Sequence, residues 1–363
     1  AAWAWAGVPR PQFVGGNEVE LLQGGDELFP RICQAIEQAE REVWFATYIF
    51  HDDGAGRRVA DALAAAARRG VAVHVVVDGF GSHHTLHTVR AWLVPAGVRL
   101  EIFRPLDRWW AWLQPGQLRR LHQKLCVADE RVAFVGGINI IDDRHDLNHG
   151  WADAPRLDFA VGVHGPLAQQ VHRTARAMWA RANLGHGWRQ ELMGLLRSAA
   201  PMDQTRELVR RLRMRPPKAL PNAPQLPVRA AFVVRDNLRQ RRSIERSYID
   251  AIRAARQHVD IAVPYFYPGQ GFRRALLRAA RRGVRVRLLL QGKVDYRIAA
   301  LAARALYDEL RAHGVRIYEY MPAWLHAKVA VVDGEWATMG SSDRKSTRLN
   351  SSHEWISRMP SSA

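Results

Sequence analysis

Two short runs of the sequence carry side chains suited to cleaving a phosphodiester. Both have the pattern His-x-Lys-x4-Asp, first as His122, Lys124 and Asp129 and again as His326, Lys328 and Asp333. Two imidazoles and two ammonium groups facing each other would form a cationic pocket without a metal ion. One imidazole would attack phosphorus and form a phosphohistidine, while the other would protonate the leaving alkoxide. A water acceptor would then give hydrolysis, and an alcohol acceptor would give transfer.

The spacing inside each motif predicts which side chains share a face. Both runs have strand character, so a period of two places His122 and Lys124 on one face and the apolar residues between them on the other. Asp129 and Asp333 stand seven positions after their histidines, an odd offset that turns them away. We therefore expect these aspartates to orient the catalytic groups rather than to take part in the chemistry.

A small-residue turn follows each motif. The first turn is Gly136-Gly137-Ile138-Asn139, and the second is Gly340-Ser341-Ser342. Non-bridging phosphate oxygens need donors placed where negative charge develops in the transition state. The two lysines, Asn139 and the N–H groups of the turns, with Ser341 and Ser342, are predicted to supply them.

An internal repeat brings both motifs to equivalent positions. Residues 35–50 match 251–266, 62–79 match 275–292, 96–103 match 313–320, and 121–129 match 325–333. In the second pair an amphipathic helix ends at Arg-Arg-Gly, where glycine serves as the C-cap, and a β-branched strand follows. Alternating helices and strands predict an α/β fold of two pseudo-symmetric α-β-α halves. Each half would hold a central mixed sheet, and the two would share one active site at their interface.

The domain boundaries follow from the repeat and from composition. The first half is predicted at residues 14–184, a helical and Pro-rich linker at 185–228, and a truncated second half at 229–342. The first half is longer in one place, because 25 residues lead from Gly97 to His122 but only 12 from Gly314 to His326. The extra residues include Trp109, Trp110, Trp112, Arg119 and Arg120.

Charge and composition narrow the classes of partner. The net charge of +18 favours an anionic partner, either nucleic acid or an acidic membrane, although arginine used as an ordinary solvated cation would give the same balance. The two cysteines, Cys33 and Cys126, have no metal-binding spacing and are interpreted as buried apolar residues. Histidines 83, 84, 87, 145 and 149 are interpreted as loop residues. No metal and no cofactor is expected.

Beyond these residues, the chain resembles the phospholipase D superfamily, in particular bacterial cardiolipin synthases of the short type without N-terminal transmembrane helices. The resemblance runs from about residue 16 to residue 342 and includes YIFHDD, VVVDGFGS, LHQKLCVADERVAFVGGINI, YFYPG and LHAKVAVVDGEWATMGSS. It implies two phospholipase-D-like halves and transfer of a phosphatidyl group between phosphatidylglycerol molecules, with release of glycerol. It also implies that His122 is the nucleophile, that His326 is the general acid and base, and that Asp158 orients a histidine.

The same resemblance implies a peripheral protein on the cytoplasmic side of the bacterial inner membrane. The tryptophan cluster, flanked by arginines, has the composition of an interfacial anchor. A loop that covers the rim of the active site would have the same composition. The basic runs Arg206–Arg215 and Arg235–Arg246 would add attraction to an anionic leaflet, or would simply be solvated helices.

Two other hypotheses about the function remain. A phosphodiesterase or nuclease of the same superfamily is compatible with the charge, although the flanking resemblance and the tryptophans favour lipid over nucleic acid. A basic binding module with degenerate motifs is a second alternative, which the intact His/Lys pairs disfavour.

Residues 343–363 back-translate to a common sequencing-library adapter, so we expect this segment to be foreign sequence. The oligomeric state and the second lipid are not predicted.

Overall fold

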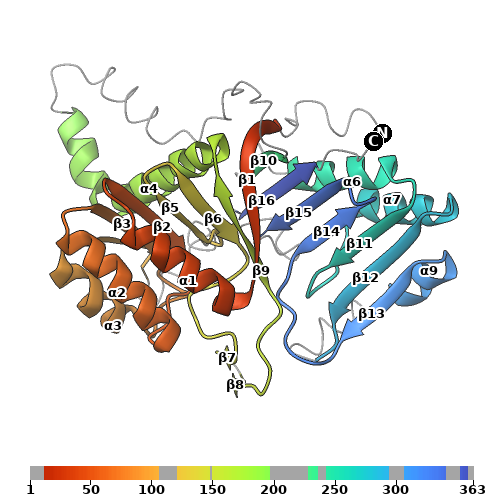
Figure 1. The fold of residues 1–363 in the computed structure, drawn as a ribbon, viewed down its shortest axis with the longest axis horizontal. Coiled ribbons are helices and arrows are strands. Elements are labelled where there is room, and N and C mark those ends of the chain that lie inside the picture. Colours follow the sequence, from red (N-terminus) through yellow and green to blue (C-terminus); the bar gives the residue numbers. More distant parts are fainter. Residues whose placement is uncertain are drawn as a thin grey trace.

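A mixed sheet runs through both halves of the chain (Figure 1). The computed structural model describes residues 12–105, 121–147, 149–196, 228–235, 243–293, 306–340 and 352–358. Within these ranges the sheet has 14 strands in the order β13-β12-β11-β14-β15-β16-β10-β1-β9-β6-β5-β2-β3-β4. A second pair, β7 (His145–Asp146) and β8 (Gly150–Trp151), forms a small hairpin apart from it.

The first half supplies seven strands of the large sheet. Its elements are β1 (Val14–Gln23), α1 (Gly24–Glu37), β2 (Glu42–Thr47), α2 (Gly54–Arg68), β3 (Ala72–Asp78), α3 (Leu86–Leu93), the 3-10 turn η2 (Val94–Ala96), β4 (Arg99–Phe103), β5 (Leu125–Ala128), β6 (Val132–Gly136), β9 (Phe159–His164) and α4 (Pro166–Leu196). Strands β2, β3 and β4 are parallel, and the remaining pairs are antiparallel.

The second half repeats this plan. Its elements are β10 (Val228–Arg235), α6 (Ser243–Ala254), β11 (His258–Ala262), α7 (Gln270–Arg281), β12 (Arg285–Gln291), α9 (Tyr307–Ala312), β13 (Arg316–Tyr320), β14 (Val329–Val332), β15 (Trp336–Gly340) and β16 (Ser352–Arg358). Strands β11, β12 and β13 are parallel, as β2, β3 and β4 are. Antiparallel pairing of β1 with β10 joins the halves. The predicted fold of two pseudo-symmetric α/β halves is confirmed.

Local sequence explains why these elements form. Asp53 caps the N-terminus of α2, because its side chain accepts a hydrogen bond from the Gly56 N–H. The helix ends at the Arg-Arg-Gly run, where Gly70 has a φ of +93°, and Gly283 has a φ of +90° at the matching point of the second half. Glycine adopts this left-handed conformation without steric cost, so the chain turns sharply from helix into strand.

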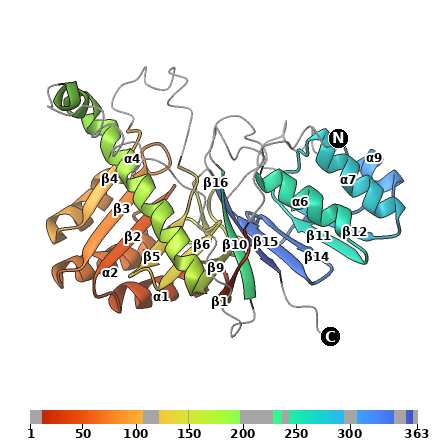
Figure 2. The same cartoon turned by 90° about the horizontal axis from the view of Figure 1, so that it is seen from above.

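The apolar core lies on both faces of the first half of the sheet. Helices α1 and α2 pack on one face, and α4 crosses the opposite face, as Figure 2 shows. Strand β5 is buried along its whole length between these layers. Because β5 is fixed on both sides, the residues at its start have a rigid support.

Several predicted features fall partly or wholly outside the described residues. Helix α4 continues to Leu196 and β10 begins at Val228, so only the ends of the predicted linker are seen. The Trp109/Trp110/Trp112 cluster, with Arg119 and Arg120, lies outside, and so does the run Arg206–Arg215. Of the run Arg235–Arg246, only its ends are described. No helix in the described part of the chain has the length and apolar character to cross a membrane.

The tail contributes one strand to the sheet. Residues Ser352–Arg358 form β16, which pairs with β10 and β15, the position that β9 occupies in the first half. A segment placed beside two strands with free edges adopts extended pairing readily, whatever its origin. The expectation that residues 343–363 are foreign sequence therefore stays a prediction.

Candidate active site

Both motif histidines lie just before a strand and not within it. Strand β5 begins at Leu125 and β14 at Val329, so His122 and His326 belong to the extended segments that lead into them. The prediction that the motifs lie within strands is therefore wrong in detail, but the histidine and lysine of each motif lie close together on one side, in agreement with the predicted shared face. Pairing with the adjacent strands of the sheet begins only after the lysines. Side chains from β3 and β12 hold the segments before them and, in the second motif, so do backbone hydrogen bonds to Leu157.

Those supporting side chains occupy equivalent positions in the two halves. Asp78, the last residue of β3, accepts a hydrogen bond from the Leu121 N–H through Oδ2 at 2.8 Å. Gln291, the last residue of β12, accepts one from the Leu325 N–H through Oε1 at 2.6 Å. Each bond fixes the residue immediately before a motif histidine. Both residues end a parallel strand and align in the repeat, so the sequence marks their positions as equivalent but not what they contact.

The two motif lysines make matching contacts. Lys124 Nζ donates to the His122 carbonyl at 3.1 Å, and Lys328 Nζ donates to the His326 carbonyl at 2.7 Å. Both lysines are buried. Lys328 Nζ also lies 3.3 Å from His326 Nε2. A buried ammonium next to a ring nitrogen is well placed to bind the oxygens of a phosphodiester.

The second motif histidine is held by a carboxylate from the first half. His326 Nδ1 lies 2.6 Å from Asp158 Oδ2, and Asp158 is buried. The contact depends on backbone pairing between the halves. The Leu157 N–H donates to the Trp324 carbonyl at 2.8 Å, and the His326 N–H donates to the Leu157 carbonyl at 2.9 Å. The orienting role expected for Asp158 agrees with this geometry.

Electrostatics around this pair favour a carboxylate and a neutral imidazole. Burial acts to raise the pKa of Asp158, but His326 and Lys328 more than offset it and hold that pKa below its usual value. Burial, and then Lys328, lower the pKa of His326, whereas Asp158 acts to raise it. The Nδ1–H then donates to Asp158, and Nε2 keeps its lone pair.

A glycine next to the first motif makes room for Asp158. A Cβ at Gly137 would collide with the Asp158 carboxylate, so this place in the turn requires glycine. Gly137 also bonds to β9, since its N–H donates to the Phe159 carbonyl at 3.1 Å. The adjacent Gly136 N–H donates to the Lys124 carbonyl at 3.4 Å. This chain of contacts connects the first motif, through Asp158, to His326.

The first motif histidine rests on an aromatic ring. The rings of His122 and Tyr48 stack with centroids 4.5 Å apart and planes 15° apart. Lys124 Nζ lies 5.4 Å from the centroid of the same tyrosine ring. Tyr48 follows β2 directly, and its position fixes the plane of the imidazole. The sequence offered only one sign of this role, an aromatic residue at the carboxyl end of a buried strand.

The predicted phosphate-binding residues are only partly described. Asn139 is buried, and its Oδ1 accepts a hydrogen bond from the Ile49 N–H at 3.3 Å, which leaves Nδ2 as the group that can donate to a phosphate. Ser341 and Ser342 lie outside the described residues. Their role therefore stays a prediction.

Asp129 and Asp333 lie at the far ends of β5 and β14, away from the histidines. Asp129 accepts hydrogen bonds from the backbone N–H groups of Glu40, Arg41 and Glu42 at 2.8–2.9 Å. Asp333 accepts three in the same way at 2.8–2.9 Å, from Arg256, Gln257 and His258.

Both aspartates adopt left-handed backbone conformations, with φ of 52° and 54°. Among residues with a side chain, aspartate is one of the few that tolerate this region. The expectation that these residues orient the catalytic groups is corrected: they fasten the loop before β2 or β11 to the end of the motif strand.

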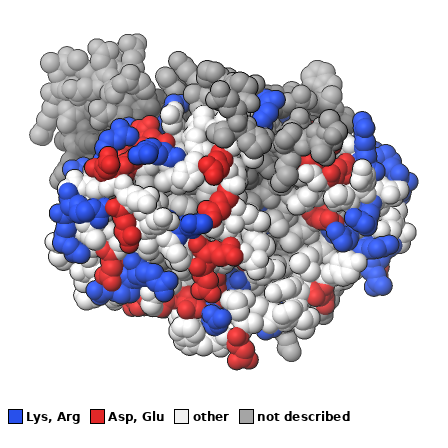
Figure 3. Space-filling model, in the orientation of Figure 1, with Lys and Arg blue, Asp and Glu red and all other residues white. Residues whose placement is uncertain are grey.

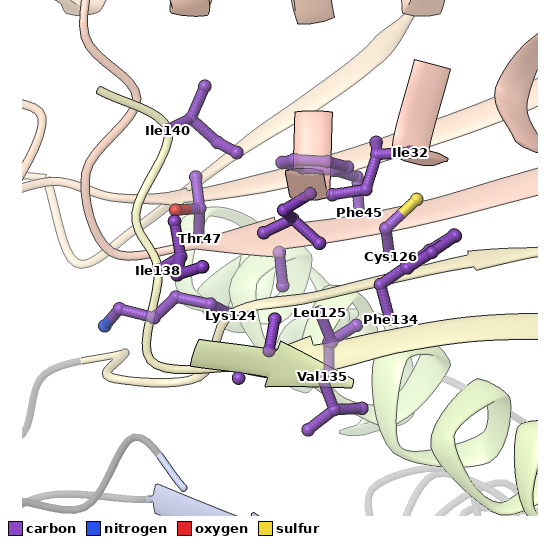
Figure 4. A pocket seen from close by; sticks show the side chains of 14 residues that line it. Ile32, Phe45, Thr47, Lys124, Leu125, Cys126, Phe134, Val135, Ile138 and Ile140 are labelled. Atoms are coloured by element: carbon purple, nitrogen blue, oxygen red, sulfur yellow. The ribbon is translucent and has the colours of Figure 1, made fainter. Parts of the chain in front are cut away.

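A small cavity of about 20 Å³ lies beneath the first motif. Apolar side chains line it, and Figure 4 shows Lys124 extending away from them. A volume of this size holds about one water molecule. The cavity is therefore a packing gap rather than a substrate site, and the chemistry belongs to the opposite side of the motif, where the ammonium points.

Comparisons with known proteins agree with this geometry. The family of cardiolipin synthase, phospholipase-D-like domains matches residues 32–152 and 248–362. Cardiolipin synthase B of Escherichia coli (strain K12) is 35% identical over 328 residues, which cover 90% of this chain and 73% of that protein. Cardiolipin synthase A of Pseudomonas fluorescens (strain SBW25) is 34% identical over 347 residues, covering 94% of this chain and 65% of that protein.

A solved structure shows a similar fold. Phosphatidylserine synthase of Haemophilus influenzae Rd KW20 superimposes with a TM-score of 0.66 at 12% identity, over 99% of this chain and 87% of that one. Sequence identity this low supports a shared fold only. The family match covers more than half of the chain, and the relatives are similar over most of their length. The chain therefore belongs to the cardiolipin synthase family of phospholipase-D-type phosphatidyltransferases.

Proposed function

We propose that this chain transfers a phosphatidyl group from one phosphatidylglycerol to another through a phosphohistidine and releases glycerol. The observation that carries the proposal is the Asp158–His326 pair, in which a buried carboxylate of one half orients a motif histidine of the other at 2.6 Å. A histidine held in this way can give up and take back a proton at Nε2. The sequence similarity to cardiolipin synthases supports the choice of substrate.

The first step forms the covalent intermediate. An imidazole nitrogen of His122 attacks phosphorus, and the bond between phosphorus and the glycerol oxygen breaks. Protonated His326 gives its Nε2 proton to that oxygen, so glycerol leaves as a neutral alcohol. Lys124 and Lys328 neutralise the non-bridging oxygens as charge builds on them. Stacking on Tyr48 holds the attacking ring in one orientation.

The second step reverses the roles. Neutral His326 takes the proton from a hydroxyl group of a second phosphatidylglycerol, and the oxygen of that hydroxyl attacks phosphorus. The bond from phosphorus to the His122 nitrogen breaks, which restores the free imidazole. The lowered pKa of His326 suits this step, because its neutral form is the base. Binding of the anionic phosphodiester beside His326 favours its protonated form before the first step.

Membrane association is also part of this proposal. Leu147 and Trp151, at the β7–β8 hairpin, are 51% and 67% exposed. This hairpin projects at the lower edge of the molecule in Figure 1, and His149 within it stacks on Trp324, two residues before His326. Apolar side chains near the second motif suit contact with a lipid surface.

The distribution of charged side chains argues against membrane contact through the broad face drawn in Figure 3. Figure 3 shows acidic side chains gathered over the middle of that face, with basic side chains on both flanks. An anionic leaflet would repel the acidic zone. We therefore assign lipid contact to the hairpin edge, and peripheral binding at the cytoplasmic leaflet follows as part of the same proposal.

The roles of the two histidines can be tested with a substrate that needs no general acid. Phosphatidyl-p-nitrophenol has a leaving group that departs without protonation. We expect His326→Ala to lose transfer from phosphatidylglycerol but to retain a burst of p-nitrophenol, with an acid-labile phosphate label on His122. His122→Ala should lose both activities. A burst that survives in His122→Ala and vanishes in His326→Ala would reverse the assignment.

The substrate class is tested in parallel. Labelled phosphatidylglycerol in vesicles and single-stranded DNA are each incubated with the wild-type chain and with His122→Ala. Cardiolipin and glycerol that depend on His122 support the proposal. Cleavage of DNA without lipid turnover would contradict it and favour a nuclease.

A further inference from the structure

A cluster of metal-binding side chain types lies in the loops beside the first motif. His51 and Asp53 belong to the turn between β2 and α2, and His145 starts the β7–β8 hairpin. One potential ligand atom from each, a ring nitrogen of either histidine or a carboxylate oxygen of Asp53, lies within 4.8 Å of the others. The three side chains are only 17%, 7% and 20% exposed. Because His51 and His145 are far apart in the sequence, their spacing gave no sign of a ligand set.

Hydrogen bonding does not account for the two histidine nitrogens. The Nδ1 atoms of His51 and His145 are buried, and neither has a hydrogen-bond partner among the residues that the structure describes. They lie 3.5 Å and 3.9 Å from Asp53 Oδ2, and His51 Nδ1 also lies 3.5 Å from Asp52 Oδ1. All three distances are too long for an N–H···O bond. Buried polar atoms left unpaired are costly, so a group that satisfies both nitrogens would stabilise the loops.

The separations suit a tetrahedral ion. Zinc binds imidazole nitrogen and carboxylate oxygen at about 2.0–2.2 Å, which places neighbouring ligand atoms roughly 3.3–3.5 Å apart. The observed 3.5 Å already meets this value, and 3.9 Å requires a shift of a few tenths of an ångström. Asp53 can take part without losing its other contacts, because Oδ1 caps α2 and Oδ2 has a second lone pair beyond the Asp142 N–H.

A second cluster of the same residue types shows the contrast. His172 Nε2 lies 2.9 Å from Glu42 Oε1, and its Nδ1 lies 3.3 Å from Glu130 Oε1. Each ring nitrogen of His172 faces its own carboxylate within ion-pair distance, although Nε2 has no hydrogen bond of suitable geometry among the described residues. In the His51/Asp53/His145 cluster, by contrast, two different histidines share one carboxylate, and a buried nitrogen of each has no hydrogen-bond partner among the described residues.

We propose that His51, Asp53 and His145 bind a divalent transition-metal ion of the zinc type, with water completing the coordination. The ion is structural and takes no part in the chemistry of the two motifs. It ties the loop after β2 to the loop after β6, which already meet through the His51 N–H and the Ile140 carbonyl at 2.8 Å. Those loops carry Tyr48, on which His122 stacks, and Asn139.

The binding test uses tag-free protein and needs no lipid. Metal-stripped wild-type chain is titrated with Zn²⁺ by calorimetry, and the bound metal is counted by mass spectrometry. We expect one zinc per chain, a higher Tm with zinc, and no competition from Mg²⁺, which prefers oxygen ligands. His145→Phe keeps the ring that stacks on Trp151 but has no ligand nitrogen, and His51→Ala removes the other nitrogen. Both should weaken zinc binding at least 100-fold.

His149→Ala is the matched control, because it removes a histidine of the same hairpin that lies outside the cluster. It should bind zinc as the wild type does. Equal affinity in all three variants, or a wild-type chain that binds no zinc at micromolar concentration, would overturn the proposal. If the cluster variants fail to fold, the zinc K-edge absorption spectrum of the wild type decides, since two imidazole ligands are expected and fewer would contradict it. Lipid transfer is assayed separately, so either proposal can fail alone.

Discussion

At the scale of single residues, Asp158 connects the chemistry of the two halves. Its carboxylate reaches across the interface to His326, where it fixes the tautomer that leaves Nε2 available. The ordinary role of such a carboxylate is to hold the ring and to stabilise the imidazolium that forms during turnover. No other described side chain makes a comparable contact with the ring of His326 at Nδ1.

Replacing this carboxylate should impair turnover more than lipid binding. We expect Asp158→Asn to lower kcat for phosphatidyl transfer by about 10²–10⁴-fold, the range seen when a catalytic histidine loses its carboxylate partner. Because Asp158 raises the pKa of His326, its loss should lower that pKa further and move the acidic limb of the rate profile to lower pH. The measurement is kcat and KM against pH. An unchanged kcat, or a limb that moves to higher pH, would refute this.

A variant that displaces Asp158 but keeps its carboxylate distinguishes the effect of its position on kcat from the effect of its charge. Gly137→Ala should displace Asp158, because the new Cβ would occupy the place of its Oδ1, and should therefore reproduce most of the loss in kcat. Gly54→Ala is the control, since a Cβ there meets nothing within 4 Å. Asp61→Asn, at an exposed ion pair with Arg57, controls for a change of charge.

At the scale of elements, each motif strand is fastened at both ends. A side chain from the end of β3 or β12, two strands away in the sheet, holds its start, and an aspartate holds its end. The start places the histidine, and the end fixes the strand against the loop before β2 or β11. Because this support at both ends of the motif strand occurs in both halves, it is a property of the repeated unit and not of one active-site residue.

The aspartates should therefore matter for stability and not for the chemical step. We expect Asp129→Ala to lower the free energy of unfolding by about 2–4 kcal/mol, because three backbone N–H groups lose their acceptor. Asp333→Ala should cost less, since its contacts are more exposed. Chemical denaturation measures the loss, and kcat of the folded protein should stay near the wild-type value. A stable Asp129→Ala protein with no activity would instead support the role first expected, orientation of the catalytic groups.

The same aspartates give stability a defined dependence on pH. Burial acts to raise the pKa of Asp129, but backbone N–H groups and Arg41 lower it below 3.8, and backbone N–H groups do the same for Asp333. A group with a lowered folded pKa stabilises the protein fully above its unfolded value, and that stability is lost as pH falls through the folded pKa. Acid titration of unfolding should therefore show a shallower decline below pH 3.8 in the alanine variants.

Much of the element plan could be predicted from the sequence, because the repeat places matching helices and strands in both halves. The odd offset of Asp129 predicted that it faces away from His122, but not what it contacts, since its partners at Glu40–Glu42 lie far earlier in the chain. The sequence pattern also placed His122 inside a strand, whereas β5 begins three residues later, at Leu125. The two motifs look alike in sequence, so nothing in their pattern reveals that Asp158 serves His326 and Tyr48 serves His122.

At the scale of the whole molecule, pairing of β1 with β10 and contacts of the Leu157–Asp158 segment with the second motif hold the halves together. The β7–β8 hairpin arises from the same connection between β6 and β9. Under the proposed function, this hairpin contacts lipid close to the boundary between the two halves. A small apolar contact is enough for a protein that binds lipid at one edge, and we propose the exposed Leu147 and Trp151 as that contact.

This contact can be measured without turnover. We expect the double variant Leu147→Ala/Trp151→Ala to bind phosphatidylglycerol vesicles about 30-fold more weakly, from a loss of roughly 2 kcal/mol of apolar burial. Leu21→Ala is the matched control, because Leu21 is 61% exposed but lies on β1, away from the hairpin. Co-sedimentation at several salt concentrations separates apolar from charge-based binding, since salt weakens only the latter. If the double variant binds as tightly as Leu21→Ala at high salt, the hairpin is not the lipid contact, and the tryptophans at 109, 110 and 112 become the next residues to replace.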